Sequence, residues 1–380
     1  MLKRILFLII ICVLLFPFDI VVVSAEENNI DATVNEIIEN LDLNSLNDWL
    51  TQIIHGKDLN EILTNMVKGG FVSNDELSSI VVGYFKSSFT PLVTLFIQLF
   101  SIILICSILS SLKPDNNQLK EIIFLVCYCA IGVAIFGLSI KSINSVKGII
   151  TSLSMQIESV FPILLTVMTA IGAKTSVAVY QPLCAGVVTI ISSIINGFLL
   201  PIVEINACLA VGESLNERFS LKKFSIFLSD VFKWIVGITI AIFSFFSVVK
   251  SITAAVYDNM SIRALKYTIA NSFPLVSGFA KEGVDVVLTS AILIKNAIGG
   301  VAIILLFFAL LAPFFEILLL SLFFKFMQAI CEPIADNRII HLLSSFAKIV
   351  GMLATLLIMI FVLYFVILIL VIVAQNGLVL

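Results

Sequence analysis

The chain has 380 residues, of which 60% are hydrophobic and only 12% are charged, and its formal net charge at pH 7 is −3. Soluble domains carry about 25% charged residues, so this composition excludes a water-soluble protein. Several apolar stretches approach or exceed the roughly 20 residues that a helix needs to cross hydrocarbon, and they are too long for barrel strands. We therefore expect an all-α, polytopic helical membrane protein.

Residues 1–25 have the layout of a secretory signal peptide. Two basic residues precede the apolar run 5–16, and small residues stand before a predicted cleavage site near Ala25. The alternative is an uncleaved first span, which Pro17 and Asp19 interrupt.

Residues 26–90 are expected to form a small helical domain, because apolar residues recur there at helical spacing. Between Glu26 and Phe89 the chain carries eleven acidic residues against three lysines. If the signal is cleaved, this acidic domain is extracytoplasmic. Its charge is either a solvated face that keeps the domain soluble or a docking surface for a basic partner.

Six long apolar stretches follow and are predicted to span the membrane. They are 91–112, 122–140, 183–203, 231–249, 301–324 and 346–374, with a short tail at 375–380. Two shorter segments, 160–173 and 272–280, are expected to be re-entrant or interfacial, because they are too short to cross. We group the body as the first two spans (91–140), a first repeat (141–249) and a second repeat (250–374).

With the N-terminal domain outside, the cytoplasmic loops are 113–121, 204–233 and 325–345. The second of these loops holds four basic residues, as the positive-inside rule expects. The outer connections also carry lysines and arginines, so charge supports this orientation only modestly. A crossing by residues 160–173 would reverse the later loops unless its counterpart also crosses.

An offset of 112 residues suggests a parallel internal repeat, with copies at about 142–249 and 254–361. It aligns Phe161-Pro162 with Phe273-Pro274, Pro201 with Pro313, and Glu204 with Glu316. Repeats are frequent in membrane transport folds, although apolar segments also resemble one another by chance.

Proline inside apolar sequence removes a backbone donor that lipid cannot replace, so such sites must be buried in protein or face water. We predict two broken or re-entrant helices; the alternative is that Pro162 and Pro274 simply start helices. The helix-break and pathway candidates are Phe161, Pro162, Pro201, Glu204, Asn271, Phe273, Pro274, Pro313 and Glu316. Of the two carboxylates, Glu316 is the stronger candidate, because Glu204 is expected to snorkel at the membrane edge.

Recognisable catalytic chemistry is absent from the sequence. The two histidines, His55 and His341, are far apart, and there is no HExxH motif, phosphate-binding loop or nucleophile elbow. We expect no enzyme activity, no cofactor, no metal site and no nucleic-acid partner. Energy for any transport must come from a gradient or from another chain.

The stretch 251–300, "SITAAVYDNMSIRALKYTIANSFPLVSGFAKEGVDVVLTSAILIKNAIGG", resembles the signature region of the stage III sporulation protein AE family. The pattern is the order Thr253-Ala254-Ala255, Arg263-Ala264-Leu265-Lys266, Asn271-x-Phe273-Pro274 and Leu293-x-Lys295-Asn296. The similarity extends over almost the whole chain, including the signal, the acidic domain and the multi-span body.

This resemblance implies a multi-span subunit of a sporulation-specific, secretion-like channel complex between mother cell and forespore, which supports forespore development. It implies as partners the other proteins of the stage III sporulation operon, including an ATPase and ring-forming subunits. It also places the chain in the mother-cell membrane around the forespore. The alternative is a free-standing secondary transporter for a small solute, which broken helices suit equally well.

Overall fold

The computed structural model describes residues 43–53, 59, 62–63, 74–111, 117–215, 221–272 and 277–373, and these residues form helices and turns without a strand. The elements are α3 (Asn44–Ile53), α5 (Asn74–Ser111), α6 (Asn117–Ala170), α7 (Lys174–Ile194), a π-helical segment η1 (Ile195–Leu199), α8 (Leu200–Leu215), α9 (Lys222–Ser272), α10 (Ser277–Cys331) and α11 (Asn337–Val373). The predicted all-helical class is confirmed for this part of the chain.

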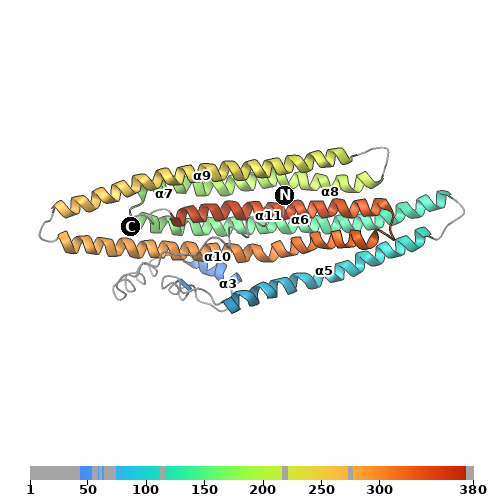
Figure 1. Ribbon diagram of the computed structural model, residues 1–380, viewed down its shortest axis with the longest axis horizontal. Helices are drawn as coiled ribbons and strands as arrows, with labels where there is room; N and C mark the ends of the chain where they lie inside the picture. The colour runs from blue at the N-terminus through green and yellow to red at the C-terminus, as the bar shows by residue number, and fades with distance from the viewer. Residues whose placement is uncertain are drawn as a thin grey trace.

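The long helices run side by side and alternate in direction along the chain (Figure 1). Helices α6 and α11 lie in the middle of the bundle, with α5 and α10 on one side and α7, α8 and α9 on the other. Helices α7 and α8 follow one another almost in line through η1, so they act as one long element. This up-and-down order follows from the short connections, which allow only antiparallel neighbours.

Six helical stretches of the described chain are long and apolar enough to cross a membrane, which confirms the predicted number of spans. They are 89–109, 125–170, 174–213, 222–247, 286–331 and 337–373. Several are much longer than one crossing requires: α6 has 54 residues, or about 80 Å at 1.5 Å per residue, against about 30 Å of hydrocarbon. The longest helices must therefore extend beyond the bilayer core.

The predicted boundaries were too short. Residues 160–173 were expected to form a separate re-entrant or interfacial segment, but residues up to Ala170 continue α6 without a break. The predicted polar loop 204–233 was likewise too long, because α8 extends to Leu215 and α9 already begins at Lys222. Amphipathic stretches that flank an apolar run stay helical here because one of their faces packs against the bundle.

The turn from α6 to α7 explains why α6 ends where it does. Gly172 has a φ of +84°, a conformation that side-chain-bearing residues rarely adopt. Its N–H donates to the Thr169 carbonyl at 2.9 Å, and the N–H of Ala173 donates to the Met168 carbonyl at 3.0 Å. This is a Schellman motif, which satisfies the last carbonyls of α6 and reverses the chain in three residues.

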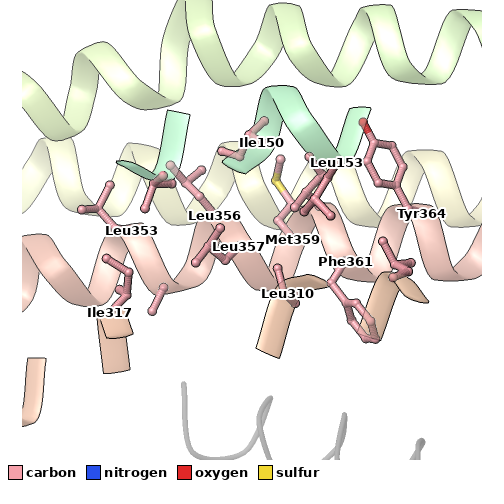
Figure 2. Close-up of a cluster of buried hydrophobic side chains, with 14 of the residues drawn as sticks. Ile150, Leu153, Leu310, Ile317, Leu353, Leu356, Leu357, Met359, Phe361 and Tyr364 are labelled. Atoms are coloured by element: carbon pink, nitrogen blue, oxygen red, sulfur yellow. The ribbon is translucent and has the colours of Figure 1, made fainter. Parts of the chain in front are cut away.

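Helix α11 forms the centre of the hydrophobic core and is the most buried of the six spans. It packs against α6, α7, α8, α9 and α10. Figure 2 shows side chains of three helices meeting along it: Ile150 and Leu153 of α6, Leu310 and Ile317 of α10, and Leu353, Leu356, Leu357, Met359, Phe361 and Tyr364 of α11. A helix that is apolar on every side is expected to be surrounded in this way.

Tyrosine hydroxyls join the long helices to one another. The Tyr128 hydroxyl on α6 donates to the Val211 carbonyl on α8 at 2.8 Å. The Tyr180 hydroxyl on α7 donates to the Leu370 carbonyl near the end of α11 at 3.3 Å. Between apolar helices in a membrane, hydrogen bonds of this kind help to set the register, because lipid offers the groups no other partner.

The described part of the N-terminal region is not remote from the spans. Helix α3 buries Leu46, Trp49 and Leu50 and packs against α6 and α10. Helix α5 begins at Asn74 and runs through the predicted domain boundary at residue 90 without interruption. The separate acidic domain and the signal peptide fall largely outside the described residues and stay predictions.

Candidate functional site

The predicted pathway residues do not converge on one place. Glu204 on α8 and Glu316 on α10 are both exposed and lie on different helices. Asn271 lies in the last turn of α9. Phe273, Pro274 and Ala25 lie outside the described residues.

Pro162 does not break a helix, contrary to the prediction, because α6 continues through it to Ala170. A proline removes one hydrogen bond, the one to the carbonyl four residues earlier, and here that carbonyl belongs to Glu158. The Pro162 side chain faces outward, and its own carbonyl accepts a bond from the Thr166 hydroxyl at 2.8 Å. Packing on either side of the site outweighs the loss of one bond. Phe161 is buried in the same turn.

Pro313 likewise lies inside the continuous helix α10. Pro201 is different, because only Leu200 separates it from the π-helical segment η1. The residue four positions before it, Gly197, lies within η1, and the wider π turn relieves the clash between a proline ring and that carbonyl. The proline pattern therefore marks one local distortion of the backbone, at Ile195–Leu199.

An open groove of about 720 Å³ lies beside this distortion, between α6 and the α7–η1 helix. It is lined by Thr151, Ser154, Met155 and Glu158 of α6 and by Val188, Thr189, Ser192, Ser193, Asn196 and Gly197 of α7 and η1. The residues from α6 follow the spacing of one helix face, as do those from α7. π-helical segments occur frequently at functional sites.

Three exposed hydroxyl groups of the groove donate their protons to backbone carbonyls. Thr151 donates to the Lys147 carbonyl at 3.0 Å, Thr189 to the Ala185 carbonyl at 3.0 Å, and Ser193 to the Thr189 carbonyl at 2.8 Å. A hydroxyl has one proton and two lone pairs, so each of these groups can offer only an acceptor to an occupant of the groove.

Ser154 connects the groove to the core. It donates to the Ile150 carbonyl at 2.8 Å, so in its 2.7 Å contact with the Tyr364 hydroxyl it is the acceptor. Tyr364 belongs to the central helix α11. The floor of the groove is thus held by a hydrogen bond to the most buried helix of the bundle.

The sequence-based interpretation named none of the polar residues of the groove. Of its candidates, only Pro162 and Pro201 are near these residues in the chain. A signal was present: in the run "TIISSIING", Thr189, Ser192, Ser193 and Asn196 recur on one helix face inside an otherwise apolar stretch. The matching hydroxyls of α6 lie in an amphipathic stretch where polar residues are unremarkable. Within the described residues, no three histidine, cysteine, aspartate or glutamate side chains gather as metal ligands.

Lys295 is the charged residue among the buried polar side chains of the described chain, and it lies fully buried in α10. One turn further along α10, a side chain at Gly299 would collide with Ile372 of α11, so only glycine permits this approach. Lys295 is not part of the groove.

These features define a class: a helical membrane protein with an apolar core and a polar groove at a distorted helix. The family model described as stage III sporulation protein AE matches residues 57–375, and the chain therefore belongs to this family. A relative named "Stage III sporulation protein AE", from Bacillus subtilis (strain 168), is 23% identical over 247 residues. That match covers 64% of this chain and 61% of the relative, less than two thirds of its length. No solved structure matches the chain.

Proposed function

We propose that this chain is a multi-span membrane subunit of a sporulation-specific, secretion-like channel or transport complex between mother cell and forespore, and that it supports forespore development. Family membership and the six apolar helices support a membrane role in sporulation. The observation that carries the transport role is the polar groove between α6 and α7–η1.

The groove is a poor surface for lipid. Glu158, Thr189, Ser193 and Asn196 are all exposed on it, and acyl chains offer neither hydrogen bonds nor charge. Ionisable residues within membrane-spanning helices almost always face a protein interior or a water-filled cavity. We infer that the open side of the groove faces water, as one wall of a pathway that neighbouring subunits complete.

The proposed partners are the other proteins of the stage III sporulation operon, including an ATPase and ring-forming subunits. The proposed location is the mother-cell membrane around the forespore, with the N-terminal domain extracytoplasmic. In the alternating bundle, the end of α5, the end of α8 and the end of α10 lie together (Figure 1). The proposal places this end in the cytoplasm, and a reporter fused between α8 and α9 should therefore be cytoplasmic.

Cysteine accessibility tests the wall of the pathway. In a variant without native cysteines, Ser193→Cys should react in intact sporulating cells with a polar thiol reagent that labels only water-exposed cysteines. Phe245→Cys is the control, because Phe245 is an exposed apolar residue of α9 that should face lipid or a partner. Protection of Ser193→Cys to the same degree as Phe245→Cys would contradict the proposal.

One observation favours a second function, a free-standing transporter for a small solute. The volume of the groove lies within the range of about 300–1,000 Å³ that small-molecule sites occupy. Purification from sporulating cells separates the two functions. Co-purification with ring-forming and ATPase proteins supports the channel subunit, whereas gradient-driven uptake by the isolated protein in vesicles supports the transporter.

A further inference from the structure

We propose that the groove between α6 and α7–η1 binds a small monovalent cation, with the Glu158 carboxylate and the groove hydroxyls as ligands. This inference rests on the proposed function, since it assumes that water and ions reach the groove. It adds the chemical class of what the groove binds.

The hydrogen-bond inventory of the groove selects the charge of the ligand. Thr151, Thr189 and Ser193 have already donated their protons to backbone carbonyls, and each presents lone pairs only. Glu158 adds a carboxylate, and no lysine, arginine or histidine lines the groove. Asn196 also lines the groove and its amide can donate, so the hydroxyls do not decide the charge of the ligand by themselves. The carboxylate does, because no basic residue of the lining balances it, and it favours a cation.

Backbone geometry adds further acceptors at the same place. Proline has no N–H, so Pro162 cannot donate to the Glu158 carbonyl, and Pro201 cannot donate to the Gly197 carbonyl. Both of these earlier residues line the groove. Two of the prolines noted in the sequence thus withhold a helical hydrogen bond from residues of one site, on facing helices. In transporters, carbonyls of locally unwound helices coordinate sodium ions, and the Gly197 carbonyl in the distorted segment η1 is the closer parallel, because α6 stays helical through Pro162.

The number of carboxylates in the groove indicates the charge of the ion that it binds. Glu158 is the only acid among the residues that line the groove, and the other side-chain ligands are neutral oxygens. Proteins bind calcium with 6–8 oxygens, usually several of them carboxylates, and magnesium through one or two carboxylates with retained waters. One carboxylate falls short of the several that a calcium site usually has, and with neutral oxygens as the other ligands it balances a single positive charge, as sodium requires.

Ion-dependent thermal unfolding tests the site on the purified full-length protein in detergent. Sodium chloride should raise the unfolding temperature more than N-methylglucamine chloride at equal ionic strength. Glu158→Gln should weaken the sodium response by about tenfold in apparent affinity or more, because a charge-assisted contact becomes a neutral one. The matched control is Glu204→Gln, an exposed carboxylate outside the groove, which should keep the response.

Two outcomes would overturn the inference. The first is an equal effect of all salts on the wild-type protein, which would indicate screening alone. The second is an equal loss of response in Glu204→Gln and Glu158→Gln. If Glu158→Gln does not fold, Ser193→Ala answers the question, since it removes one exposed oxygen and should lower sodium affinity while leaving the protein folded.

This experiment needs no partner protein, so it separates the inference from the proposed function. A missing sodium response in a protein whose Ser193→Cys variant reacts with aqueous reagent would refute the cation site and leave the water-lined wall. A selective response in a protein that recovers no sporulation partners would support the site and count against the channel subunit.

Discussion

Two pairs of antiparallel helices in this molecule are built alike and lined differently. The α10–α11 pair is joined by a short turn and is packed with leucine, isoleucine and phenylalanine. The α6–α7 pair is also joined by a short turn, but its exposed side carries hydroxyls, an amide and a carboxylate. The antiparallel arrangement is shared, so the difference lies in the side chains and in the π-helical segment that follows α7: the first pair stabilises the bundle, and the second offers a polar surface.

The largest effect is expected in the apolar pair, from Leu357→Ala. Leu357 is fully buried among α6, α10 and α11, and truncating it leaves a cavity (Figure 2). Such changes cost about 2–5 kcal/mol. The free energy of unfolding in mixed detergent should fall by this amount, whereas Ile190→Ala, at an exposed position of α7, should change it little. Similar losses in both variants would show that α11 is not the centre of the core.

A smaller loss is expected from Gly299→Ala in the same pair. The new methyl group would collide with the Ile372 side chain, and overpacking of this kind costs about 1–3 kcal/mol. Gly237→Ala on α9 is the control, because nothing lies within 4 Å of a side chain there and alanine favours a helix. Thermal unfolding of the two variants should therefore shift in opposite directions. A stabilised Gly299→Ala protein would contradict the close approach of α10 and α11.

Tyr364→Phe tests the contact that joins the two pairs. It removes the hydroxyl that donates to Ser154 at 2.7 Å, and a buried hydrogen bond of this type contributes about 0.5–1.5 kcal/mol. The free energy of unfolding should fall by about that amount, and a double-mutant cycle with Ser154→Ala isolates the shared part. Additive losses would mean that the hydroxyls do not interact.

The smallest effect on stability is expected in the groove, from Thr189→Val. This change keeps the shape of an exposed side chain and removes its oxygen, so the free energy of unfolding should change by no more than about 0.5 kcal/mol. Sporulation efficiency in a complementation assay should nevertheless fall, because the groove loses an acceptor. Thr166→Val, an exposed threonine of α6 outside the groove, is the control and should sporulate normally.

The long apolar runs were sufficient to predict the class and the number of spans, because hydrocarbon accepts few backbone structures other than helices. They were insufficient to predict where helices end. The break expected at Pro162 does not occur, since one missing hydrogen bond costs less than the packing around it contributes. The second Phe-Pro site lies outside the described residues, so the internal repeat stays a prediction.

The amino-acid sequence by itself indicated an all-helical membrane protein and the six helices of the described chain that are long and apolar enough to span, because composition and run length decide how a chain partitions into oil and water. Its ordered motifs also pointed to the family to which the chain belongs. Only the tertiary structure decided that hydroxyls from α6 and α7 share one groove with Glu158, beside a π-helical turn before Pro201. The groove residues of α6 are 30 or more positions before those of α7 in the chain, and no local preference specifies which helix faces will meet.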